Sequence, residues 1–96
     1  MNEQKIIKEI IDVVITFIHP SRVIMFGSRA GGKAREYSDF DIAVEGVDMD
    51  IRKERLLKEA LDKKMGIFTV DLINLDKADR EFKRLISQKG KVIYEC

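Results

Sequence analysis

The chain has 96 residues, enough for one domain with a real hydrophobic core but with little room for a second lobe. Its 18 basic and 17 acidic residues leave a net charge of +1, which gives no electrostatic case for binding nucleic acid. Hydrophobic residues make up 45% of the sequence, a fraction that favours a globular protein over a disordered one.

Cysteine usage and hydropathy indicate the compartment. The one cysteine, Cys96, excludes an intrachain disulfide and fits a reducing environment. The first apolar stretch is interrupted by Lys8, Glu9 and Asp12, which argues against a signal peptide and against a membrane span. We therefore expect a cytoplasmic protein.

The N-terminal segment is predicted to be an amphipathic helix. Isoleucine, valine and phenylalanine recur at intervals of three and four over residues 3–18, and Pro20 ends the pattern. Val13 and Ile15 widen the apolar stripe beyond what one core contact needs. Two interpretations stay open: these residues belong to a partner surface, or they pack under a strand at residues 91–95.

The next segment is predicted to be two strands joined by a turn. Residues 22–26 form an apolar run typical of a buried strand, and residues 39–45 alternate between polar and apolar positions. Residues 28–38 contain two adjacent glycines and few apolar groups, so a turn is expected there.

A second helix is predicted to begin after Asp48 or Asp50, either of which could cap it, and to continue through about Lys64. Gly66 suits its C-terminal cap. The positions expected to be buried on this helix are Ile51, Leu57, Ala60 and Leu61.

The C-terminal third is predicted to contain a strand at residues 68–74, a helix over residues 78–89 capped by Asp76, and a short strand at residues 91–94. The helix positions expected to face inward are Phe82, Leu85 and Ile86. The order of elements predicts a single α/β or α+β domain over residues 1–96, with a mixed four-stranded sheet flanked by helices.

The most informative motif is Gly27-Ser28, then ten residues, then Asp39-Phe40-Asp41. A strand has a period of two, so Asp39 and Asp41 should share one face while Phe40 occupies the other. Neighbouring carboxylates repel each other, and a divalent cation between them relieves that repulsion.

A third acid, Asp71, occurs in the same kind of setting. On the strand predicted at residues 68–74, Asp71 should face away from the core together with Thr69 and Ile73. Three aspartates on strands, behind a Gly-Ser turn, predict a metal-dependent nucleotide site.

Nucleotidyl transfer needs residues of these types. Its transition state gathers negative charge on phosphate oxygens, so catalysis consists mostly of positioning and cationic stabilisation. Magnesium prefers carboxylates, waters and phosphates as ligands, and a pair of ions can activate the attacking oxygen and stabilise the leaving one. Asp39 and Asp41 could bridge two such ions, and Asp71 could complete the site beside the attacking hydroxyl.

The Gly-Ser turn and the residues after it are candidates for binding the nucleotide. Gly27 permits close approach of a phosphate to the backbone, and Ser28 offers a hydroxyl and an amide. Arg29 and Lys33 are close enough in sequence to neutralise the β- and γ-phosphates.

This motif, with the third acid on a later strand, resembles the minimal nucleotidyltransferases of the DNA polymerase β superfamily. The resemblance implies a nucleotidyltransferase fold, two magnesium ions held by Asp39, Asp41 and Asp71, and contacts of ATP with Gly27, Ser28 and Arg29. It also implies a HEPN-domain toxin as the partner, with transfer of AMP to one of its tyrosines, so that the chain acts as an antitoxin.

The sequence departs from the family pattern at one point. After Arg29 it has Ala30-Gly31-Gly32, where many relatives carry another basic residue. Lys33 and Arg35 are candidate substitutes for that charge, and a solvated loop is the other interpretation of both.

Three functions compete at this level. The first is the adenylyltransferase, and the second is a non-catalytic binding module that neutralises its partner by occlusion. The third, a polymerase fragment bound to nucleic acid, lacks the basic surface expected for phosphate contacts. A homo-oligomer is also compatible with the sequence.

Overall fold

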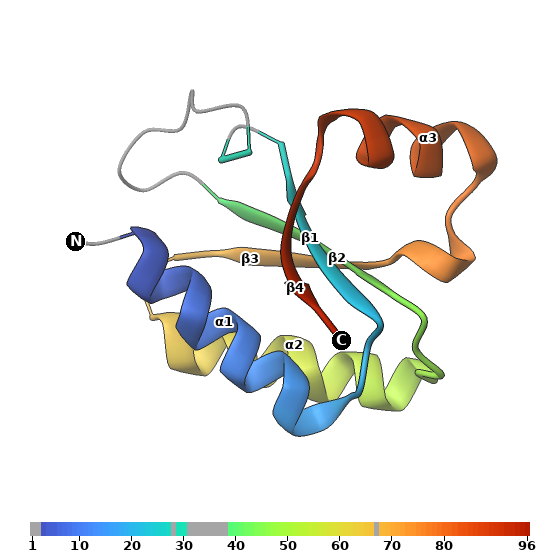
Figure 1. Ribbon diagram of the computed structural model, residues 1–96. Helices are drawn as coiled ribbons and strands as arrows, with labels where there is room; N and C mark the ends of the chain where they lie inside the picture. Colours follow the sequence, from blue (N-terminus) through green and yellow to red (C-terminus); the bar gives the residue numbers. More distant parts are fainter. Residues whose placement is uncertain (1–2, 28, 31–38, 67) are drawn as a thin grey trace.

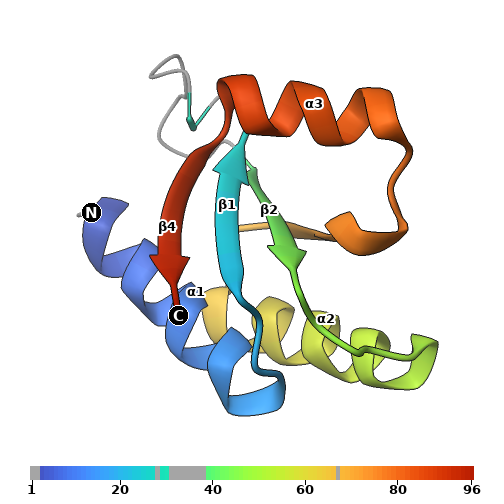
Figure 2. The ribbon, with the colours of Figure 1, turned by 45° about the vertical axis from the view of Figure 1, so that its right-hand side comes forward.

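The structure is a computed structural model that describes residues 3–27, 29–30, 39–66 and 68–96. One four-stranded sheet carries α1 and α2 on one face and α3 on the other (Figures 1 and 2). The elements are α1 (Glu3–Phe17), β1 (Arg22–Phe26), β2 (Phe40–Glu45), α2 (Ile51–Met65), β3 (Val70–Asn74), a 3₁₀ turn η1 (Leu75–Lys77), α3 (Arg80–Lys89) and β4 (Lys91–Glu95). The predicted mixed sheet flanked by helices is confirmed.

The strand order is β3-β2-β1-β4. β1 runs antiparallel to both β2 and β4, whereas β2 and β3 are parallel and are connected through α2. The register places Asp41 of β2 beside Asp71 of β3 and opposite Phe26 of β1. Two of the predicted site residues are therefore neighbours across a strand pair.

The two faces of the sheet have separate apolar clusters. The larger cluster lies under α1 and α2, and its strand residues include Val23, Met25, Phe40, Ile42 and Leu72. The smaller cluster lies under α3 and consists of Ile24, Ala43, Leu75 and Ile86. Because side chains alternate along a strand, Asp41 and Asp71 lie on the α3 face, beyond the part of that face which α3 covers.

Two helix caps agree with the sequence and one does not. Asp50 caps α2, accepting a hydrogen bond of 2.7 Å from the Lys53 amide, and Gly66 ends that helix. The prediction that Asp76 caps the third helix is wrong, because η1 intervenes and Asp79 caps α3 instead. Asp76 instead accepts hydrogen bonds from the backbone N–H groups of Gly46 and Val47, at 3.0–3.1 Å, and so fastens the loop after β2.

Two residues expected to be buried are exposed. Ile51, at the first position of α2, is 75% exposed, and Leu85 of α3 is 49% exposed. α3 is ten residues long, and Ile86 is its one buried residue, so the helix contacts the sheet along a narrow line. Phe68 is buried as predicted but precedes β3, which begins at Val70.

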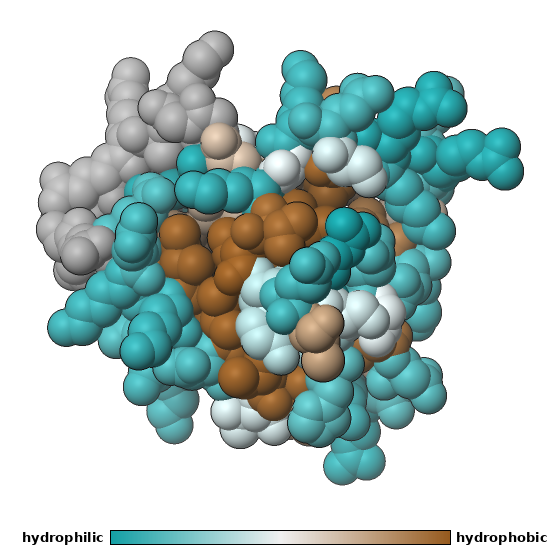
Figure 3. All heavy atoms as spheres, in the orientation of Figure 1, coloured by the Kyte–Doolittle hydropathy of each residue, from teal (hydrophilic) through white to brown (hydrophobic). Residues whose placement is uncertain are grey.

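The half-buried residues of α1 lie on two sides of its buried stripe. Val13 packs against the larger cluster, so it is partly a core residue. Ile7, Ile11 and Ile15 recur every four residues and are also half-buried. Figure 3 shows a band of hydrophobic surface between α1 and β4. No helix in the described part of the chain has the length and apolar character needed to cross a bilayer.

Candidate active site

The three predicted aspartates lie on or directly before adjacent strands. Asp41 is on β2, Asp71 is its register partner on β3, and Asp39 immediately precedes β2. Asp39 and Asp71 are exposed, whereas Asp41 is half-buried. The parallel pairing of β2 with β3 thus brings together two carboxylates that are 30 residues apart in the sequence.

These carboxylates are electrostatically coupled. Burial raises the pKa of Asp41 above its ordinary value of 3.8, and the charge of Asp71, a hydrogen bond with the Asp71 side chain and the charge of Asp39 raise it further. Every one of these causes disfavours the ionised form of Asp41. A cation bound between the carboxylates would reverse that preference, because it favours ionised ligands.

Gly27 is pressed against this pair. Its φ is +74°, a conformation that residues with a side chain rarely adopt, and a Cβ atom built there would overlap Oδ2 of Asp41. Glycine is therefore required at this position for two independent reasons, one conformational and one steric. Gly27, the first residue of the Gly-Ser motif, is therefore in direct contact with the side chain of Asp41.

Of the other predicted nucleotide ligands, the structure describes Arg29. Ser28, Lys33 and Arg35 lie outside the described residues, so their contacts with a nucleotide stay predictions. The Arg29 side chain is 6% exposed, and its Nη1 donates to Oε2 of Glu3 at 3.1 Å. Its guanidinium also stacks over the Phe40 ring, 4.2 Å from the centroid. Phosphate binding by Arg29 likewise stays a prediction.

Sequence reasoning missed the Glu3–Arg29 pair. The pair connects the first turn of α1 to the segment after Gly27, and the stacking on Phe40 connects that segment to β2. No local pattern relates two residues that are 26 positions apart in the chain. Burying an arginine requires such partners, because an unpaired buried charge is costly.

Carboxylates are ligands that suit magnesium, although the acids do not form a complete metal-binding site by themselves. Among the described residues, no three histidine, cysteine, aspartate or glutamate side chains are grouped closely enough to hold a metal ion. Magnesium commonly uses one or two carboxylates and takes its other ligands from water and from substrate phosphates. The paired Asp41 and Asp71 therefore fit an ion that arrives together with a nucleotide.

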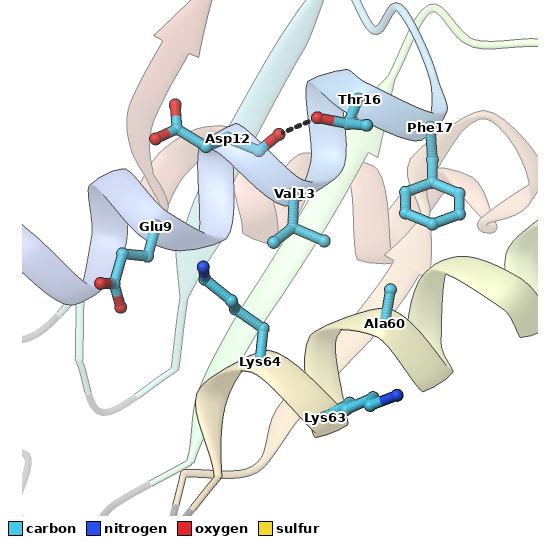
Figure 4. A pocket seen from close by; sticks show the side chains of 8 residues that line it. All are labelled: Glu9, Asp12, Val13, Thr16, Phe17, Ala60, Lys63 and Lys64. Atoms are coloured by element: carbon cyan, nitrogen blue, oxygen red, sulfur yellow. Dashed lines mark hydrogen bonds between the residues drawn. The ribbon is translucent and has the colours of Figure 1, made fainter.

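Two hollows lie near the helices that cover the sheet. A groove of about 450 Å³ runs along β3, where Asp41, Asp71, Lys58 and Asp62 contribute to its lining. A larger hollow of about 700 Å³ separates α1 from α2, and none of the three predicted site aspartates lines it; Val13, Phe17 and Ala60 point into it (Figure 4). Asp71 therefore lines the smaller groove, at the β3 edge of the sheet.

The family described as "Polymerase beta, Nucleotidyltransferase" matches residues 8–96. The chain belongs to this nucleotidyltransferase family. Among relatives, the nucleotidyltransferase is 35% identical over 71 residues to the probable protein adenylyltransferase MntA of Haemophilus influenzae. The aligned region covers 73% of this chain and 62% of the Haemophilus protein. It is 33% identical to a protein of Methanocaldococcus jannaschii that is also named an adenylyltransferase, over 98% of this chain and the whole of that protein.

Solved structures agree with this assignment. A crystal structure of a toxin–antitoxin with AMP-PNP superposes with a TM-score of 0.82 at 26% identity, covering 94% of the nucleotidyltransferase chain and 73% of the other. A complex of the tri-AMPylated Shewanella oneidensis HEPN toxin with its MNT antitoxin gives 0.79 at 25% identity, covering 99% and 74%. The resemblance inferred from the Gly-Ser and aspartate motif is confirmed at the level of family and fold.

Proposed function

We propose that this nucleotidyltransferase transfers AMP from ATP to a tyrosine of a HEPN-domain toxin and thereby acts as its antitoxin in the cytoplasm. The observation that carries the proposal is the coupled pair Asp41–Asp71 beside Gly27, on the open part of the α3 face. The names of the Haemophilus and Methanocaldococcus relatives and the AMPylated toxin in the Shewanella complex support the choice of reaction and partner.

In this proposal Asp39, Asp41 and Asp71 hold two magnesium ions, which supply positive charge to the phosphate oxygens and to the attacking oxygen when they are bound. Gly27 presents no side chain, so a phosphate can approach the backbone beside Asp41. Asp71 lies on the edge strand and lines the groove along β3, and the proposal assigns it to the metal beside the incoming hydroxyl.

The reaction balances as a displacement at the α-phosphorus. The tyrosine oxygen gives its proton to solvent and forms a bond to that phosphorus, while the bond between the α-phosphorus and the bridging oxygen of the β-phosphate breaks and pyrophosphate leaves. The carboxylates must be ionised to take part as ligands. The raised pKa of Asp41 therefore makes its ionisation and its metal binding mutually dependent.

A non-catalytic module that neutralises its partner by occlusion is the second candidate. It is favoured by the absence of a finished three-acid cluster among the described residues and by the burial of Arg29 against Phe40 and Glu3. Incubation with α-labelled ATP, magnesium and the HEPN partner separates the two functions. Label that becomes fixed to the partner supports transfer, whereas stable binding of the partner without label supports occlusion.

A further inference from the structure

A separate pocket opens on the other side of Gly27 from the acids. It has a volume of about 390 Å³ and lies between the end of β1 and α3. Its lining residues are Phe26, Gly27, Phe82, Leu85, Ile86 and Lys89. Gly27 is thus shared: it contacts the Asp41 carboxylate and also lines this apolar pocket.

The walls of this pocket are mostly hydrophobic and partly exposed. The rings of Phe26 and Phe82 meet edge to face, with centroids 5.8 Å apart and an interplanar angle of 90°. Leu85 is 49% exposed although it lies next to these rings. Lys89 is in the last turn of α3 and makes no ion pair within the part of the chain that the structure describes. An apolar slot with one cation at its side suits an aromatic ring that carries polar edges.

The groove along β3 and the apolar pocket lie to either side of Asp41 in the strand order. The strand order is β3-β2-β1, so the groove with Asp71 lies on the β3 side, and the apolar pocket lies on the β1 side. A nucleotide with its phosphates at Gly27 and Asp41 can direct its base into the apolar pocket. The groove along β3 is then left free for the acceptor.

We propose that this pocket binds the base of the nucleotide, with the ring against Phe82 and Leu85 and the Lys89 ammonium beside its polar edge. This inference rests on the proposed function, and it assigns to α3 a role in substrate selection that the acids do not provide. A purine buries more of its surface in such a pocket than a pyrimidine does, so ATP should bind more tightly than CTP or UTP.

The test compares Leu85→Asp with Leu56→Asp. Leu56 of α2 is 47% exposed and does not line the pocket, so it is a matched control for placing a charge on a half-exposed leucine. Affinities for ATP and for inorganic tripolyphosphate are measured by calorimetry with magnesium. We expect Leu85→Asp to weaken ATP about tenfold, a loss in the range of base–aromatic stacking, and to leave tripolyphosphate unchanged. Leu56→Asp should change neither affinity.

Two results would overturn the assignment of this pocket to the base. Equal weakening of ATP and tripolyphosphate, or no weakening of ATP, would overturn the base pocket while leaving the nucleotidyltransferase site intact. A raised KM for the HEPN partner with unchanged ATP affinity would assign the pocket to the acceptor and also overturn it. If the wild-type chain bound neither ATP nor tripolyphosphate, the proposed function itself would fail. Should Leu85→Asp unfold, Leu85→Ala is measured in the same way, with a smaller loss of ATP affinity expected.

Discussion

Replacing Gly27 with alanine should damage both stability and the site, and Gly66 provides a matched control for separating the two effects. Both glycines have positive φ values, +74° and +64°, so alanine at either position is strained by about 1–3 kcal/mol. A Cβ at Gly66 meets nothing within 4 Å, whereas a Cβ at Gly27 overlaps the carboxylate of Asp41. Only Gly27→Ala must therefore displace a site residue.

Thermal unfolding and magnesium–ATP binding measure the two effects. In a domain of this size each kcal/mol corresponds to about 4–8 °C in Tm, so Gly66→Ala should lower the Tm by about 4–24 °C and leave nucleotide affinity unchanged. Gly27→Ala should lower the Tm at least as far and abolish AMP transfer. Normal transfer by a folded Gly27→Ala variant would refute the contact between the glycine and the carboxylate as a requirement of the site.

Two further predictions concern charge and surface. The pKa of Asp41 is raised in the folded state, so the folded chain binds this proton more tightly than the unfolded chain does. Without divalent cations, the free energy of unfolding should therefore increase as the pH falls through the raised pKa towards 3.8. Asp41→Asn should therefore be at least as stable as wild type at pH 7 without magnesium, and a clearly lower Tm would contradict the coupling. Ile15→Lys, at a half-buried apolar position of α1, should weaken binding of the HEPN partner at least tenfold in a folded protein, whereas Ile51→Lys on α2 should not. Loss of the cooperative thermal transition in Ile15→Lys would instead show that Ile15 is a core residue.

The sequence predicted which way Asp41 and Asp71 face, because that depends on local periodicity. Alternation along β2 places Asp41 on the face opposite Phe40, and the Gly-Ser and aspartate motif indicated the family that matches residues 8–96. The pairing of Asp41 with Asp71 follows once β2 and β3 are adjacent and parallel. Period-two patterns were therefore sufficient to predict the strands of the sheet, and apolar spacing with helix caps was sufficient to predict most of the helices.

Features that depend on tertiary contacts were not predictable in this way. Asp76 and Asp79 are both acceptable caps in sequence, and the choice between them depends on the loop after β2, whose amides bind Asp76. The exposure of Leu85 follows from the narrow contact of α3 with the sheet. The burial of Arg29 depends on partners from two other elements, which no local spacing indicates.

The most direct test of the account is the mass of the HEPN partner after incubation with ATP, magnesium and the nucleotidyltransferase. The partner should gain one or more AMP groups with wild type and with Asp12→Asn, which changes an exposed acid on α1. It should gain none with Asp39→Asn or Asp41→Asn, although both variants remain folded. AMP transfer at the wild-type rate by both of these variants would contradict the assignment of the metal site and the mechanism built on it.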